Sequence, residues 1–77
     1  MQPNAEALIQ ALREERALAP DHRSTGASDA DLDWAIVTIE DGRIDGLGSL
    51  SRAVVDRWSL TASLSDQVVA FARRTAL

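Results

Sequence analysis

The segment 28–42 constrains the fold most, because it carries the signals of one complete amphipathic helix. Ser28 precedes Asp31 by three residues, which is the spacing of a capping box. Apolar side chains then recur at helical spacing within a sector of about 100°; they are Leu32, Ala35, Ile36 and Ile39. Gly42 follows as a typical helix stop. We therefore predict a helix over residues 29–41 that packs this apolar face into a core.

A β-hairpin is the competing interpretation of the same region. Residues 36–39 are all β-branched, and Asp41-Gly42 is a strong signal for a tight turn. The alternative fold is α+β, with one hairpin at about 35–47 packed on helices. We prefer the helix because of its capping signal and its narrow apolar sector. Trp34 and Val37 lie off that sector, so they form either a second packing face or an exposed patch that needs a partner.

Three further helices are expected from capping residues and apolar spacing. A first helix is expected over residues 5–18, with Asn4 as its N-cap. Another is expected over residues 50–58, with Ser49 as its N-cap, after a glycine-rich link from Gly42 to Gly48. The last helix is expected over residues 65–76. The segment 19–28 is rich in small polar residues, so we expect a connector outside the core.

The predicted fold is thus one small all-α domain of four helices, residues 1–77. Its core is expected to contain Leu8, Leu12, Leu32, Ile36, Ile39, Leu50, Val54, Trp58, Val68 and Phe71. The charged second half of the first helix, which includes Glu14 and Glu15, is expected to face solvent.

The chain lacks the usual stabilisers of a small fold. It has 77 residues, no cysteine and one histidine, which excludes disulfides and a zinc cage. Such a domain either packs its helices very well or shares its core with a partner. No apolar run reaches the roughly 18 residues of a membrane span, and no basic-then-apolar leader is present, so we expect a cytoplasmic protein without membrane contact.

Charge is divided unevenly along the chain. Residues 1–42 carry nine acids and three arginines, whereas residues 43–77 carry three acids and five arginines. The net charge of −4 opposes non-specific binding to nucleic acid or to anionic membrane. Clustered aspartate and arginine instead suit polar contacts at the rim of a protein interface.

An acidic ladder gives the sharpest motif, and it is similar to an EF-hand calcium loop. Asp29, Asp31 and Asp33 match the first three side-chain ligand positions, and Glu40 matches the twelfth. The glycine needed at position six is replaced by Trp34, however. We therefore interpret these acids as helix-capping charges and predict no metal.

Residues 46–50 bear a faint resemblance to the motif of acyl carrier proteins. In that family a serine that opens a helix receives a phosphopantetheine arm, which the resemblance would place on Ser49. The acid that normally precedes this serine is replaced by Gly48 here. Only 28 residues follow Ser49, which is too few for the remaining helices of that family. A helix N-cap is the preferred role, and no cofactor is predicted.

A helix-turn-helix is the remaining alternative. It would use the predicted helices 50–58 and 65–76, with Arg73 and Arg74 exposed beside Asp66 and Gln67. An acid at the leading end opposes DNA binding. No catalytic set is apparent either, since His22 lies alone in the connector.

We therefore expect a protein that is not an enzyme but a protein–protein interaction module. It would act as a homo-oligomer or as a small accessory or regulatory subunit of a larger protein. The expected contact residues are Trp34, Val37, Asp29, Asp31, Asp33, Arg73 and Arg74.

Overall fold

The computed structural model describes residues 4–76 and confirms the all-α class. Its α-helices are α1 (Ala5–Ala17), α2 (Asp29–Asp41), α3 (Ile44–Arg57) and α4 (Ser63–Ala76), with a 3-10 turn η1 at Pro20–His22. These residues contain no strand, so the alternative hairpin at 35–47 is wrong. That region instead forms the end of α2 and the start of α3, separated by Gly42 and Arg43.

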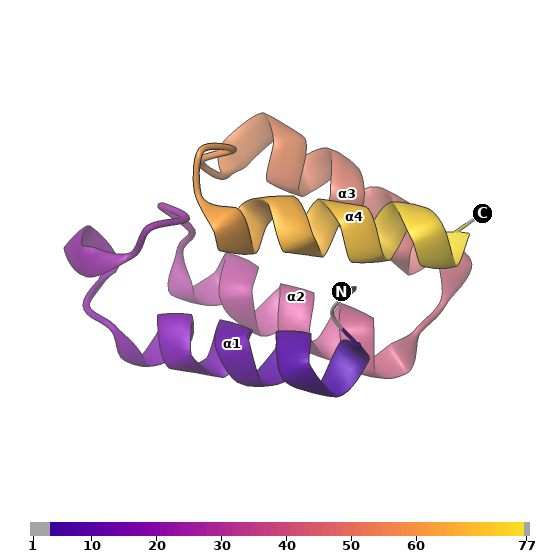
Figure 1. Cartoon of the computed structure of the whole chain (residues 1–77), viewed down its shortest axis with the longest axis horizontal. Coiled ribbons are helices and arrows are strands. Elements are labelled where there is room, and N and C mark those ends of the chain that lie inside the picture. The colour runs from indigo at the N-terminus through magenta and orange to yellow at the C-terminus, as the bar shows by residue number, and fades with distance from the viewer. Residues whose placement is uncertain (1–3, 77) are drawn as a thin grey trace.

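The helices form two antiparallel pairs that pack on each other (Figure 1). One pair is α1 with α2, and the other is α3 with α4. The most extensive helix–helix contacts lie within these two pairs. Smaller contacts join α1 to α4 and α2 to α3. The apolar face of every helix therefore turns toward a common interior.

The core confirms the predicted list with one adjustment. All the predicted residues are buried except Phe71, which is partly buried against the cluster. The structure adds Ala27, Ala35, Leu47, Val69 and Ala72. Trp34 and Val37 are not needed to complete this interior.

The predicted start of the third helix is wrong, because α3 begins at Ile44 and not at residue 50. Gly46 and Gly48 lie inside it, although each costs about 1 kcal/mol relative to alanine. Leu47 offsets this cost, since it is fully buried one turn before Leu50. Tertiary burial thus extends the helix through a segment whose local preference is weak.

The connector between α1 and α2 also differs from expectation. Arg23, Thr25 and Ala27 are buried, and Glu15 at the end of α1 is buried as well. The segment 19–28 is therefore part of the packed structure. Its conformation depends on side-chain hydrogen bonds.

Candidate functional site

The outer face of α2 presents two apolar side chains to solvent. Trp34 is 38 % exposed and Val37 is 62 % exposed. The helix that carries them is capped at its N-terminus by Ser28, whose hydroxyl accepts from the Asp31 N–H at 3.1 Å. It ends at Gly42, which has a φ of 71° and donates its N–H to the Thr38 carbonyl. Both ends of α2 are thus fixed locally, so the position of this apolar pair is well defined.

Thr38 explains part of the packing next to Trp34. Its hydroxyl donates to the Trp34 carbonyl at 2.7 Å, and its side chain is buried. A Cβ built on Gly46 would lie 3.5 Å from Thr38 Cγ2. The start of α3 therefore approaches α2 closely beside the exposed pair.

The acidic ladder forms ion pairs with arginines of the same chain. Asp33 Oδ1 lies 3.1 Å from Arg16 Nε, and Asp31 Oδ1 lies 3.8 Å from Arg57 Nη1. Asp29 Oδ1 lies 2.6 Å from Arg23 Nη2 and 3.5 Å from Arg16 Nη1. The aspartates therefore join α2 to α1, to the connector and to α3.

The ion pair with Arg23 changes the acidity of Asp29. The hydrogen bond from Arg23 is the largest influence and lowers the pKa of the Asp29 carboxyl. Desolvation raises this pKa by less, and the charges of Arg16 and Arg23 lower it further. This carboxyl is consequently an anion with fixed partners.

The structure does not gather the four acids of the calcium hypothesis into a loop. Asp29, Asp31 and Asp33 lie in the first two turns of α2, whereas Glu40 lies at its other end and pairs with Arg13 at 3.8 Å. Asp29 and Glu40 are eleven positions apart in this helix, so a rise of about 1.5 Å per residue separates their Cα atoms by about 16 Å along the axis. Within residues 4–76, no group of three or more histidine or acidic side chains is placed to hold a metal ion.

Arg23 is the residue that sequence reasoning missed. Its side chain is only 1 % exposed, and its guanidinium donates to the carbonyl oxygens of Glu15, Arg16, Leu18 and Ala27 as well as to Asp29.

Glu15 Oε2 accepts from the Thr25 N–H at 2.8 Å, and the Thr25 carbonyl accepts from the Ser59 N–H at 2.7 Å. We call Glu15, Arg23, Thr25 and Asp29 the Arg23 cluster. An arginine among small polar residues gave no sequence signal for this role.

Three other candidate positions lie apart from the α2 face. Ser49 is exposed in the second turn of α3, whose N-cap is Arg43, so the predicted N-cap role of Ser49 is wrong. Ser49 does not open a helix, as the carrier resemblance would also require. Arg73 and Arg74 are exposed in the last turn of α4, which packs on α3 and α1. The structure therefore does not bring these arginines together with Trp34 and Val37.

His22 lies on η1 beside Asp21, with 4.0 Å between Nε2 and Oδ2. Both side chains are largely exposed. A general base must be oriented by its surroundings, and an imidazole this exposed is not.

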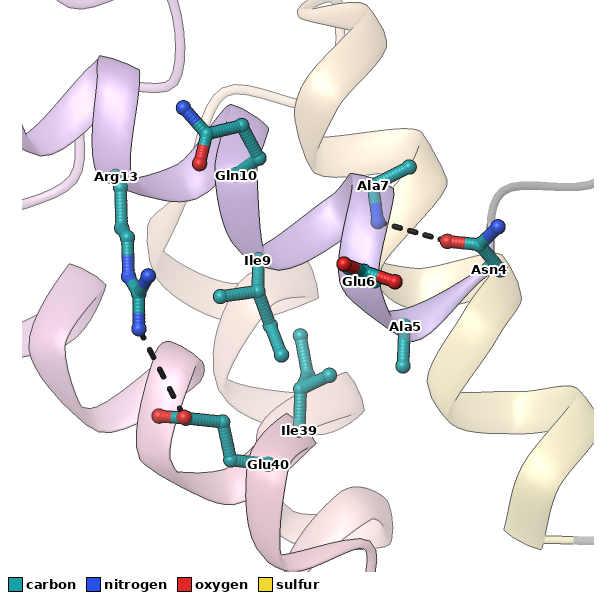
Figure 2. Close-up of a pocket in the computed structure, with 9 residues that line it drawn as sticks. All are labelled: Asn4, Ala5, Glu6, Ala7, Ile9, Gln10, Arg13, Ile39 and Glu40. Carbon is teal, nitrogen blue, oxygen red and sulfur yellow. Dashed lines mark hydrogen bonds and ion pairs between the residues drawn. The ribbon is translucent and has the colours of Figure 1, made fainter.

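An open groove of about 790 Å³ lies where α1 begins and α2 ends, and Figure 2 shows its lining. Ile9 and Ile39 form its apolar floor, while Arg13 reaches across to Glu40. Asn4 caps α1 at its edge by accepting from the Ala7 N–H at 2.7 Å. Arg13 and Glu40 pair with each other, and Glu6 is the one further charged residue of the lining. These residues do not form a nucleophile–base set.

Within residues 4–76, no helix is both long enough and apolar enough to cross a membrane. Comparison of the chain with protein-family models, with curated proteins and with solved structures gave no match.

Proposed function

We propose that this chain is a non-catalytic protein-binding module, which binds a second copy or a larger protein through the outer face of α2. The observation that carries the proposal is the exposure of Trp34 and Val37 above a core that is complete without them. One helical turn separates the two side chains, so they can enter a single apolar pocket of a partner.

Trp34 is the expected energetic centre of this surface. Tryptophan is enriched among the few residues that supply most of the binding energy of an interface. Its partial burial against the chain limits the side-chain entropy that would be lost on binding. Val37 adds apolar area one turn further along α2.

The charged groups around this pair suit a polar rim. Asp33 is already paired with Arg16, and Asp31 with Arg57. Because each acid has a cation beside it, the rim presents little uncompensated charge to a partner. Binding through this face is therefore expected to depend only weakly on salt, in contrast to binding through a cluster of unpaired charges.

Light scattering on a sizing column, over a range of protein concentrations, tests the self-association form of the proposal. A mass that increases with concentration is expected to return to that of a monomer in Trp34→Ala and in Val37→Ser. Loss of a central tryptophan should raise the dissociation constant about 30-fold. Val55→Ser is the matched control, because Val55 is an exposed apolar residue of α3 that belongs to no proposed surface.

A fluorescence measurement tests the same face directly. Trp58 is buried, so Trp58→Phe leaves Trp34 as the single tryptophan of the chain. Association is expected to shift Trp34 emission to shorter wavelength and to protect it from acrylamide. If the chain is monomeric at every concentration, the accessory-subunit form of the proposal is tested instead. The amount of a larger protein that the wild type captures is then compared with the amount that Trp34→Ala captures, and the variant is expected to capture less. The proposal fails if the Trp34→Ala/Val37→Ser double variant retains both its self-association and its partner capture.

A further inference from the structure

A groove of about 680 Å³ lies between the second half of α1 and the start of α4. Both segments lie at the end of the molecule where the connector joins α1 to α2 (Figure 1). The α1 side of its lining includes Ala11, Glu14, Glu15 and the C-cap residue Leu18. The other side includes Ala62, just before α4, and Leu64 within it. No residue of α2 contributes to it, so it is separate from the surface that carries Trp34.

The groove offers apolar area that the core does not use. Leu18 is 45 % exposed at the end of α1, and Leu64 is only partly buried. Leu60, four residues before Leu64, is also exposed in the adjoining turn. Exposed leucines beside a groove are typical of a surface that packs against another apolar segment.

All the charged groups that line the groove are acidic. They are Glu14 and Glu15, whereas the arginines of α1 turn toward α2, where Arg13 pairs with Glu40 and Arg16 with Asp33. No arginine of α1 is therefore paired with the two glutamates. The buried Arg23 of the connector donates to the Glu15 main-chain carbonyl, but it does not line the groove. The groove consequently has one sign of charge, unlike the paired rim around Trp34.

Glu15 is a buried carboxylate that has no ion pair within the described chain. It is 7 % exposed, and its Oε2 accepts from the Thr25 N–H at 2.8 Å and from the Ser24 hydroxyl at 3.3 Å. These neutral donors stabilise the anion but do not cancel its charge. Because a buried charge is poorly screened, a cation in this groove would be attracted more strongly than at an open surface.

We propose that the α1–α4 groove binds an apolar segment of another protein that carries arginine or lysine. The apolar side chains of that segment pack on Leu18 and Leu64, and its cation faces Glu14 and Glu15. The charge of the groove selects against nucleic acids and anionic lipids, which the two glutamates repel. This surface goes beyond the α2 face, and it holds whether or not Trp34 binds a partner.

The test is a titration of the ¹⁵N-labelled full chain, followed by its amide NMR signals. The probe is a synthetic 12-residue amphipathic peptide of leucine, alanine and arginine, and the reference peptide has glutamate in place of each arginine. We expect saturable shifts at residues 11–18 and 61–67 with the arginine peptide, and none with the glutamate peptide.

Variants separate this groove from general attraction to an acidic chain. Glu14→Gln and Leu18→Ser, both at exposed positions, should each weaken binding about fivefold. Glu6→Gln removes the same charge from the same helix outside this groove and should leave binding unchanged. Circular dichroism confirms that each variant is folded.

Three outcomes would overturn the proposal. The first is a shift pattern spread over the acids of α2, and the second is equal weakening by Glu6→Gln and Glu14→Gln. The third is a change of the signals at 11–18 and 61–67 on dilution without peptide, which would assign the groove to a second copy. None of these outcomes depends on the Trp34 experiments, so the two proposals can fail separately.

Discussion

Arg23 Nη2 lies 2.6 Å from Asp29 Oδ1, and this contact joins a buried arginine of the connector to the first residue of α2. The same guanidinium donates to main-chain carbonyls at the end of α1 and in the connector. One side chain therefore fixes the end of α1, the connector and the start of α2. This contact therefore adds a polar restraint on α2 to the packing of its apolar face in the core.

Arg23→Ala is expected to remove most of the stability of the chain. It leaves several buried carbonyl groups without donors, at a cost of about 3 kcal/mol, and a domain of this size rarely has more than about 5 kcal/mol in total. Arg23→Lys should cost about 2 kcal/mol, since one ammonium cannot reach all the acceptors. Urea denaturation followed by circular dichroism measures both. Arg52→Ala, at an exposed position of α3, should stay within about 0.5 kcal/mol of the wild type; equal stability of Arg23→Ala and Arg52→Ala would contradict the role of the cluster.

The lowered pKa of Asp29 predicts a loss of stability in acid. The carboxyl has a lower pKa in the folded chain than its ordinary value of 3.8, so its stabilising contribution is complete above that value. The contribution is then lost as the pH falls through the folded pKa. Asp29→Asn, which cannot titrate, should lose less unfolding free energy than the wild type between about pH 6 and pH 3. Urea denaturation at both pH values checks this, and parallel losses in the two proteins would refute it.

The glycines of residues 42–48 should respond to alanine in opposite ways. Gly48 lies inside α3 with open space around the position of a Cβ, so Gly48→Ala should stabilise the chain by about 0.5–1 kcal/mol. Gly42 has a φ of 71°, so Gly42→Ala should destabilise it by about 1 kcal/mol. Thermal unfolding of the two variants measures the difference. A flexible link at 42–48 would instead give two changes of the same sign or none.

The two tryptophans should differ sharply in their effect on stability. Trp58 is buried at the end of α3, so Trp58→Ala should cost about 3–5 kcal/mol. Trp34 lies on the outer face of α2 and is 38 % exposed, so Trp34→Ala should cost only about 1–2 kcal/mol. Chemical denaturation gives both values. A large loss in Trp34→Ala would mean that this side chain serves the fold and would weaken its assignment to an interface.

Local signals in the sequence were sufficient for much of the fold. The capping box at Ser28 and the stop at Gly42 place α2 at the predicted residues 29–41. Asn4 caps α1 as expected. These features depend on residues within one or two turns of each other, so they can be recognised without knowledge of the rest of the chain. The apolar spacing likewise identified most of the core, because burial follows the helical period.

The features that the sequence analysis predicted wrongly or missed depend on contacts between distant residues. Whether Gly46 and Gly48 are helical was decided by the burial of Leu47 in the interior shared by all four helices. Arg23 and Glu15 are charged residues, which are ordinarily exposed, and only the convergence of α1, the connector and α2 supplies the partners that allow their burial. The sequence by itself thus determined which segments are helices and which faces are apolar. Only the tertiary structure decided where α3 begins, which charges pair, and which apolar side chains stay on the surface, because each of these depends on what packs alongside.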